Sequence, residues 1–374
     1  GAASLAAAEC SVKELRWSMC DTPDFIQAWD ALALRAVEPN PFHESWFLLA
    51  SLRGLDAGES VSLLVARDQG ALAGIMPIRH EPRYYGKPIP HLATWTHPNS
   101  FLGAPLVAAG SEQAFWRGLL KWADRTTEQG LFLHLAGMPL NGRLYESLLQ
   151  VLEEQDRRSG VVFCESRAIL ATDQSPEEFF NSSTSTKARS ELRRKQARLG
   201  EMGELAFAWQ YDSIGIGEWS DQFLALEASG WKGESKTAMA SSAKTAGMFR
   251  EAMSGAAERG KLLRLSMTLD GRPLAMLTSF LSAPGAFGFK IAFDEAYARY
   301  SPGVLLQREN LKILEREDIA WSDSCAGPDN KMIGQLWPQR REIGRISMAI
   351  GGGIRRALFS RLLGAELRRK SMKA

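Results

Sequence analysis

The sequence predicts a mixed α/β protein made of two α/β units in tandem. Strand-like runs alternate with amphipathic helices along the whole chain, and the order of elements in the first half is mirrored in the second. A polar stretch, Asn181–Thr186, separates the halves, and 374 residues are enough for two domains of ordinary size. We therefore expect one unit over residues 1–180, a second over 181–350, and a basic helix over 351–374.

The composition narrows the class of protein. The chain is 45% hydrophobic and 24% charged, which is typical of a soluble globular protein, and its net charge of +2 gives no general field for DNA. Four cysteines without paired spacing predict a reducing compartment and no zinc or other metal site. Because the sequence shows no secretory signal and no long apolar run, we expect a cytoplasmic protein.

In the first unit, the predicted order is helices, a hairpin, a helix, a strand, a helix and a strand. Residues 24–55 are helical with a break at the prolines 39 and 41, and residues 61–66 and 71–78 form the hairpin. Residues 84–103 are rich in turns. The later helices are expected over 112–129 and 144–157, and the later strands over 131–135 and 161–164.

The second unit repeats this scheme. Asp270 and Gly271 form a strong hairpin signal between the runs 261–269 and 272–281, and a third strand is expected over 286–293. A helix over 304–316 and a short strand over 319–325 follow. Before these strands lies a helix, residues 187–198, with six basic residues and one acidic residue. It can be a solvated surface helix or an arm that contacts phosphate groups.

The junction between the third strand and the following helix is the most informative stretch. Ser301 is a good N-cap residue, Pro302 suits the first helical position, and Gly303 leaves the first turn without a side chain. A helix N-terminus of this kind presents unpaired N–H groups and a positive dipole end to an anion. The alternative interpretation is that the three residues only cap a scaffold helix.

Three motifs then carry a family resemblance: Leu192–Lys195 (Leu-Arg-Arg-Lys), Glu227–Gly233 (Glu-Ala-Ser-Gly-Trp-Lys-Gly) and Tyr300–Leu306 (Tyr-Ser-Pro-Gly-Val-Leu-Leu). Together with the element order, they resemble the GNAT superfamily of acyl-CoA-dependent N-acyltransferases, and within it the CelD-type branch. The tandem organisation is similar to that of Fem-type aminoacyltransferases. The common Gln/Arg-x-x-Gly-x-Gly/Ala pyrophosphate loop of the superfamily is absent, so the branch alone implies coenzyme A.

The resemblance implies two tandem GNAT-like units, with acetyl-CoA or another acyl-CoA as co-substrate of the second. It also implies a set of cofactor-binding residues: Arg193, Arg194, Tyr300, Ser301, Pro302, Gly303, Val304 and Leu305. Acyl transfer of this type needs no protein nucleophile, because the acceptor amine attacks the thioester directly. The protein has to accept a proton, stabilise an oxyanion and hold the donor. We expect the oxyanion donor to be a backbone N–H within residues 291–293.

All five histidines lie in the first 134 residues, so a carboxylate is the expected base in the second unit. The candidates are Glu227, Asp294 and Asp323. Each has a structural alternative, as a helix surface residue, a turn former and a strand-end polar group, respectively. The side chains expected to bind substrate are Trp231, Lys232 and Lys290.

The sequence leaves three functions open. The first is acyl transfer to a small-molecule or sugar amine in polysaccharide or envelope metabolism. The second is a Fem-like transfer from aminoacyl-tRNA, and the low net charge makes tRNA the less favoured partner. The third is a GNAT-like unit that binds a ligand without catalysis. The basic helix after residue 351 can pack on its own domain or make peripheral contact with a membrane.

Overall fold

The computed structural model describes residues 6–126, 130–230, 233 and 238–373. The contacts within the chain divide it into two compact units. Unit 1 consists of residues 1–52, 56–165 and 341–374, and unit 2 consists of residues 53–55 and 166–340. Among the described residues, no helix combines the length and the apolar character that crossing a bilayer requires.

Unit 1 is built on a mixed sheet with strand order β1-β2-β3-β4-β6-β13-β7, and the short strand β5 pairs with β3. The pairs of β1 with β2, β2 with β3, and β6 with β13 are antiparallel, whereas β4 and β6 are parallel. The predicted hairpin is therefore confirmed as β2 and β3. The strands are β1 Ser11–Arg16, β2 Val61–Asp68, β3 Ala71–Glu81, β4 His91–Thr94, β5 Leu106–Val107, β6 Phe132–Pro139, β7 Ser159–Leu170 and β13 Gln339–Ala349.

The helices of unit 1 pack their apolar faces on this sheet. Thr22 caps α1 by accepting a hydrogen bond from the N–H of Phe25. In α3, a Cβ at Gly118 would lie 2.2 Å from the carbonyl oxygen of Cys10, so glycine permits the close approach of α3 to the start of β1. The helices are α1 Pro23–Leu34, α2 Ser45–Leu55, α3 Glu112–Arg125, α4 Arg143–Glu154 and α12 Gly353–Lys373.

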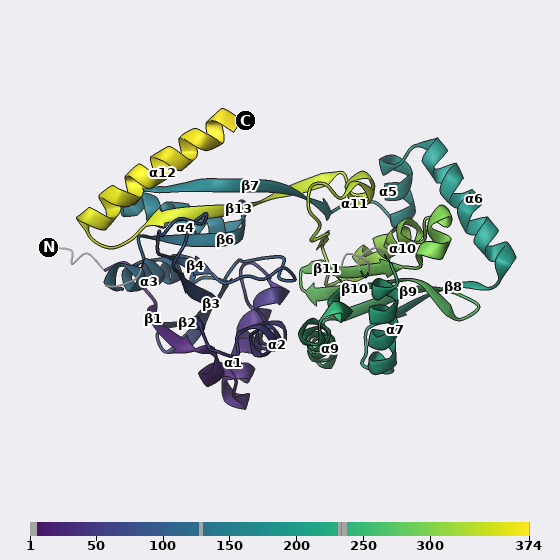
Figure 1. The fold of residues 1–374 in the computed structure, drawn as a ribbon, viewed down its shortest axis with the longest axis horizontal. Helices are drawn as coiled ribbons and strands as arrows, with labels where there is room; N and C mark the ends of the chain where they lie inside the picture. The colour runs from purple at the N-terminus through teal and green to yellow at the C-terminus, as the bar shows by residue number, and fades with distance from the viewer. Residues whose placement is uncertain (1–5, 127–129, 231–232, 234–237, 374) are drawn as a thin grey trace. The chain divides into compact units, whose positions relative to one another are not determined.

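The basic C-terminal helix α12 packs on unit 1 (Figure 1). Phe359 is 1% exposed and Leu363 is fully buried, in a cluster with Phe132, Val162 and Ala349. The other side of the helix is charged and exposed. This is the arrangement in which an amphipathic helix covers its own domain.

In unit 2 the strand order is β12-β11-β10-β9-β8, and β12 also pairs antiparallel with the end of β7 at Ile169 and Leu170. Neighbouring strands in this order are antiparallel except β11 and β12, which are parallel. Asp270 and Gly271 have φ angles of 50° and 78°, as expected for the tight turn of the β9–β10 hairpin. The strands are β8 Leu205–Gln210, β9 Leu262–Leu269, β10 Arg272–Ser282, β11 Gly285–Phe293 and β12 Trp321–Asp323.

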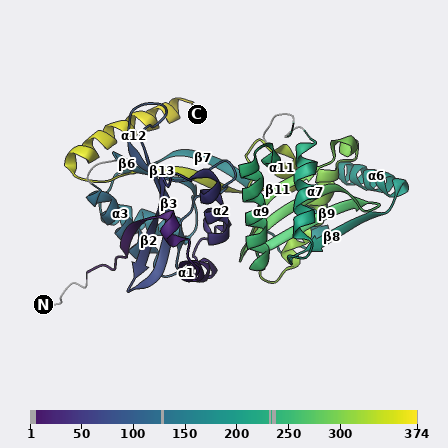
Figure 2. The same cartoon turned by 60° about the horizontal axis from the view of Figure 1, so that its bottom comes forward.

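Helices cover both faces of this sheet. Figures 1 and 2 show α7 and α9 on one face, and α5, α6 and α10 on the other. The core on the second face joins Leu192 and Leu199 of α6 to Leu305 and Leu306 of α10. The helices are α5 Pro176–Ser183, α6 Thr186–Met202, α7 Ile216–Ala228, α9 Ala243–Glu258, α10 Pro302–Asn310 and α11 Lys331–Leu336.

Five of the described strands were not expected from the sequence: β1, β4, β5, β8 and β13. β1 and β8 lie at the two ends of the strand order and are exposed at several positions, so they lack a continuous apolar run. The helix expected over 304–316 is also shorter, because α10 ends at Asn310 and continues as a 3₁₀ helix, Leu311–Glu315.

A buried histidine in unit 1 makes the stability of this unit dependent on pH. The ring of His134 is 8% exposed, and its Nδ1 lies 2.9 Å from the hydroxyl of Ser347. Burial, followed by the charges of His91 and Arg345, lowers the pKa of His134 from its usual 6.5 to about 3. The unfolded chain therefore binds more protons than the folded chain between these two pH values, and stability is lost as the pH falls through this window.

We expect His134→Gln to flatten the acid limb of the stability curve. The slope that it removes between pH 6.5 and 3 should reach about 1.4 kcal/mol per pH unit, as measured by urea unfolding at a series of pH values. His80→Gln is the control, since His80 lies at the surface beside Glu14. Equal slopes for wild type and His134→Gln would contradict the prediction.

Candidate functional site

The ladder between two neighbouring strands of unit 2 ends within the first half of β11, where β12 ends. The parallel ladder between β11 and β12 consists of three pairs and ends at Phe287 and Asp323. β11 continues from there to Phe293, where it is still paired with β10 on its other side. In the described part of unit 2, the ladder between β11 and β12 therefore covers only the first three residues of β11.

A bulge lies in β11 directly after this point. The register with β10 changes from Lys290 opposite Thr278 to Gly288 opposite Ser279, which leaves Phe289 as an extra residue. A bulge takes backbone groups out of the ladder and redirects neighbouring side chains. The sequence analysis did not predict this bulge, which lies two residues before the expected oxyanion donors at 291–293.

The N-terminus of α10 follows β11 through a short 3₁₀ helix, Glu295–Tyr300. Ser301 precedes the first helical residue, Pro302, as predicted, but its hydroxyl makes no capping hydrogen bond. The reason is its left-handed backbone (φ 51°, ψ 54°), in place of the extended conformation usual for an N-cap. The hydroxyl instead accepts a hydrogen bond of 2.9 Å from Nζ of Lys195 in α6.

A cavity of about 500 Å³ lies beside this helix N-terminus. Lys195 and Val304 line it, together with the loop and first turns before and within α6 and one face of α11. Gly303 is buried, and a Cβ there would make ordinary contacts of 3.5 Å with Phe293 and 3.7 Å with Met332. The full lining is Ser183, Thr184, Ser185, Ala188, Glu191, Leu192, Lys195, Val304, Met332, Gln335 and Leu336.

The other expected cofactor-binding residues are distributed around α10. Arg193 lines a separate cavity of about 590 Å³ between α5, α6 and the end of α10, and Arg194 is exposed. Tyr300 is half-buried beneath the guanidinium of Arg299, 5.0 Å from its ring centre. Leu305 is 1% exposed and belongs to the core. The structure thus brings Lys195, rather than Arg194, to the Ser-Pro-Gly turn.

Glu227 is buried near the end of α7, with 3% of its surface exposed. It follows Trp219 and Phe223 at helical spacing, so the three side chains share the face that packs towards α9 and the sheet. Its Oε1 accepts a hydrogen bond of 2.8 Å from the N–H of Met239. A carboxylate in such apolar surroundings can serve as a proton acceptor, and it also fixes the chain that returns from α7 to α9.

The motif Glu227–Gly233 ends in a glycine for a steric reason. A Cβ at Gly233 would lie 1.6 Å from the carbonyl oxygen of Ala228, so no side chain fits there. Trp231 and Lys232, which the sequence suggested for substrate binding, lie outside the described residues.

The two aspartates occupy different environments. Asp294 ends β11, accepts a hydrogen bond from the N–H of Ala296 and pairs with Arg272 at 2.9 Å. Asp323 is fully buried, and both of its carboxylate oxygens accept 2.8 Å hydrogen bonds from Arg167 of β7. A carboxylate held on both oxygens by a guanidinium is a poor proton acceptor, because protonation would break the ion pair.

Lys290 belongs to a polar row across the sheet. It lies opposite Thr278 of β10, which lies opposite Arg264 of β9, so the three side chains share one face. Arg264 is 1% exposed, packs 5.9 Å from the ring centre of Trp219, and donates hydrogen bonds of 2.9 Å to the carbonyl oxygens of Asp212 and Ile214. The sequence analysis missed this row, although an arginine within an apolar strand was a visible signal.

The comparisons with known proteins agree with this geometry. Residues 186–330, which lie within unit 2, match the family described as the acetyltransferase (GNAT) domain. This range includes α6, the strands β8 to β12, and α10. The chain therefore contains a GNAT-type acetyltransferase domain. No curated protein matches the chain in sequence.

Solved structures resemble a larger part of the chain. FemX is 11% identical with a TM-score of 0.55, over 86% of this chain and 95% of its own. A conserved protein of unknown function from Bacteroides thetaiotaomicron is 11% identical with a TM-score of 0.57, over 87% and 97%. The C-terminal domain of a putative lysylphosphatidylglycerol synthetase from Agrobacterium fabrum is 10% identical with a TM-score of 0.52, over 89% and 93%. Such identities show the fold alone, and the predicted fold class, a mixed α/β protein, is confirmed.

The Arg167–Asp323 pair gives a prediction about stability. Arg167→Met leaves a fully buried carboxylate without its partner and should lower the free energy of unfolding by about 3–5 kcal/mol in urea titrations. Arg316→Met is a matched control, because Arg316 holds Asp318 in the same two-pronged geometry at 2.9 Å, but at the surface. That control should cost less than about 1 kcal/mol. Similar losses for both variants would show that burial does not set the value of the pair.

Proposed function

We propose that unit 2 transfers an acyl group from acyl-CoA to an amine acceptor by direct attack of the amine, as an acetyltransferase of the CelD-type branch. The observation that carries the proposal is the anion-binding arrangement at the start of α10, where Lys195 is fixed on the hydroxyl of Ser301 beside a cavity. A Cβ at Gly303, in the first turn of α10, would lie 3.5 Å from Phe293, the last residue of β11. A positive helix end and a lysine together suit a pyrophosphate.

The residues at the turn fit a coenzyme A pyrophosphate. Pro302 has no N–H, and the N–H of Leu305 already bonds to the carbonyl oxygen of Ser301. The N–H groups of Gly303 and Val304 belong to the first turn, before the intrahelical hydrogen bonds begin, and point out of the helix end. These two groups and Nζ of Lys195 would hold the phosphate oxygens. When bound, acyl-CoA supplies a thioester that an amine can attack.

Of the three candidate acids, Glu227 fits the role of proton acceptor best. It is buried among apolar side chains, whereas Asp294 caps a turn and Asp323 is held by Arg167. Glu227 would take the proton of the attacking ammonium directly or through water. The bulge at Phe289 is the part of β11 best suited to present a backbone N–H to the oxyanion.

The acceptor in this proposal is a small-molecule or sugar amine of polysaccharide or envelope metabolism, as the CelD-type resemblance implies. Lys290, in the polar row with Thr278 and Arg264, supports an acceptor that also carries an acidic group. Localisation in the cytoplasm is part of the proposal, because acyl-CoA is made and used there.

The fold likeness to FemX supports a second candidate function, transfer of an aminoacyl group from aminoacyl-tRNA. A tRNA donor would need broad phosphate contacts and would bind in a strongly salt-dependent way. A third candidate is a GNAT-like unit that binds acyl-CoA without turnover. The two experiments below separate the three functions.

Acetyl-CoA should raise the melting temperature of the protein, because it binds the folded state. Gly303→Glu should abolish the shift by placing a carboxylate at the helix end, whereas Gly303→Ala should keep it, since a Cβ fits at 3.5 Å from Phe293. Lys195→Gln should weaken binding about tenfold, the loss of one charged hydrogen bond. Arg194→Gln, which removes the same charge from an exposed neighbour, should leave binding unchanged.

The absence of a shift with acetyl-CoA, longer acyl-CoAs and free coenzyme A would reject the acyl-CoA proposal. Salt-sensitive binding of tRNA under the same conditions would then favour the second candidate.

Glu227→Gln should lower kcat by about 10²–10⁴ while the dissociation constant of acetyl-CoA stays the same. The amide oxygen can still accept the hydrogen bond from Met239, so the fold is retained. The measurement is steady-state transfer to a panel of amines, with the pH dependence of kcat followed in both proteins. An unchanged kcat and pH profile would show that the base lies elsewhere, and binding without any turnover in wild type would favour the third candidate.

A further inference from the structure

We infer that a cavity beneath α12 in unit 1 binds the hydrocarbon chain of an anionic amphiphile, with its head group on the basic residues of α12. The cavity has a volume of about 610 Å³, which is in the range of small-molecule binding sites. None of its lining residues is assigned to acyl transfer, so the inference goes beyond the proposed function. Its lining is Tyr84, Tyr85, Lys87, Ile89, Val162, Phe163, Leu362, Ala365, Glu366, Arg369, Lys370 and Lys373.

The walls of the cavity are apolar. Tyr84 packs against Phe132, with ring centres 5.0 Å apart, and its hydroxyl donates a 2.5 Å hydrogen bond to Glu366. Burial raises the pKa of Glu366 above its ordinary value, against the opposing effects of the Tyr84 hydroxyl and the charge of Arg369.

Large apolar side chains also remain exposed at this site. Tyr85 is 67% exposed and Phe163 is 42% exposed, although both line the cavity. Exposed apolar surface of this extent around a cavity marks a binding site more often than single scattered residues do. A chain of methylene groups would remove both the wall and these rings from water.

The charge around the cavity selects the head group. Four cations line it, Lys87, Arg369, Lys370 and Lys373, against the single carboxyl group of Glu366. Three of the four lie within the last two turns of α12. Cations collected at the end of an apolar cavity complement a carboxylate, a phosphate or a sulfate at the end of a hydrocarbon chain.

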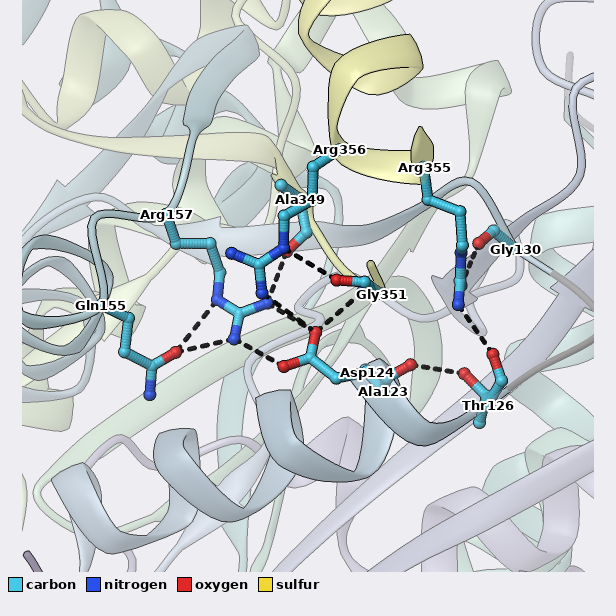
Figure 3. A network of polar contacts seen from close by, with 10 residues as sticks. All are labelled: Ala123, Asp124, Thr126, Gly130, Gln155, Arg157, Ala349, Gly351, Arg355 and Arg356. Atoms are coloured by element: carbon cyan, nitrogen blue, oxygen red, sulfur yellow. Dashed lines mark hydrogen bonds and ion pairs between the residues drawn. The ribbon is translucent and has the colours of Figure 1, made fainter. Parts of the chain in front are cut away.

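The start of α12 is anchored to the rest of unit 1 by hydrogen bonds. Figure 3 shows Asp124 at the centre of the contacts that fix the start of this helix: it accepts 2.8 Å hydrogen bonds from Arg157 and from the N–H of Gly351. Arg355 donates a 2.8 Å hydrogen bond to the carbonyl oxygen of Thr126, and Arg356 donates one of 2.8 Å to that of Gly351. A helix fixed in this way gives a preformed site, which does not have to open before a ligand enters.

Two sources could supply such a chain: an amphiphile dispersed in water, or a lipid in an anionic bilayer. The first experiment uses the full chain and the fluorescent probe dansyl-undecanoate, with dodecyl phosphate and dodecyltrimethylammonium as competitors. We expect saturable binding, displacement by dodecyl phosphate and weak displacement by the cationic competitor. Ala365→Trp, which fills the cavity from α12, should weaken probe binding at least about tenfold.

A double variant, Arg369→Gln with Lys373→Gln, tests the role of the cations that line the cavity. It should weaken binding of the anionic probe about tenfold. The matched control is Arg361→Gln with Arg368→Gln, which removes the same charge from exposed positions of α12 that do not line the cavity. The control should bind the probe like wild type. Circular dichroism and thermal melting confirm that each variant is folded.

Vesicles distinguish the two sources. Co-sedimentation with phosphatidylglycerol vesicles, but not phosphatidylcholine vesicles, that is lost in Ala365→Trp would identify a bilayer lipid. Probe binding without co-sedimentation would identify a dispersed amphiphile. Three results would overturn the inference: no saturable binding of probe or vesicles, equal binding by wild type and folded Ala365→Trp, or an oligomer of wild type that Ala365→Trp dissociates. The last would show that a second copy covers the cavity.

Discussion

The buried ion pair between Arg167 and Asp323 is the interaction on which the candidate site of unit 2 depends. It joins β7 to β12 through two hydrogen bonds of 2.8 Å, and Oδ1 of Asp323 accepts a third, of 2.7 Å, from the N–H of Cys325. The carboxylate thus fixes both the position of β12 and the turn by which the chain leaves it. Because β12 stops at this residue, its ladder with β11 stops at Phe287. A buried pair of this kind is expensive to desolvate, and its value here lies in specifying where the strand ends.

The fold was predictable where local chemistry and packing agree. The β9–β10 hairpin has a turn that needs two left-handed residues, Asp270 and Gly271, between runs that are apolar enough to be central strands. β13 shows the opposite case. It begins with the charged stretch Gln339–Glu342, and its apolar residues become regular only from Ile343, so it has no strand signal at its start. Its pairing partner β6 is about two hundred positions away, and no local pattern reveals such a contact.

The candidate site was predictable in its motifs and not in its contacts. The Ser-Pro-Gly signature located the start of α10, but the sequence could not show that Ser301 adopts a left-handed conformation and leaves its hydroxyl to Lys195. The neighbouring arginines of α6 looked equally suitable from the sequence. They differ because a helix turns by about 100° per residue, so the three adjacent basic residues point in different directions and Lys195 is the one that bonds to Ser301. Such a choice depends on the rotation of α6, which the packing of Leu192 and Leu199 sets.

The same anion site bears on the choice between donors. Structures that share this fold at 10–11% identity need not share a substrate, so the fold cannot decide the donor. The contacts are more specific: one lysine, one helix end and a cavity of about 500 Å³ form a compact site with few charges. A compact site matches a pyrophosphate, whose charge is concentrated within a few ångströms. A nucleic-acid donor spreads its charge over many phosphates and needs a broad basic surface, which a chain with a net charge of +2 does not supply in general. The distribution of charge, rather than the fold, therefore favours acyl-CoA as the donor.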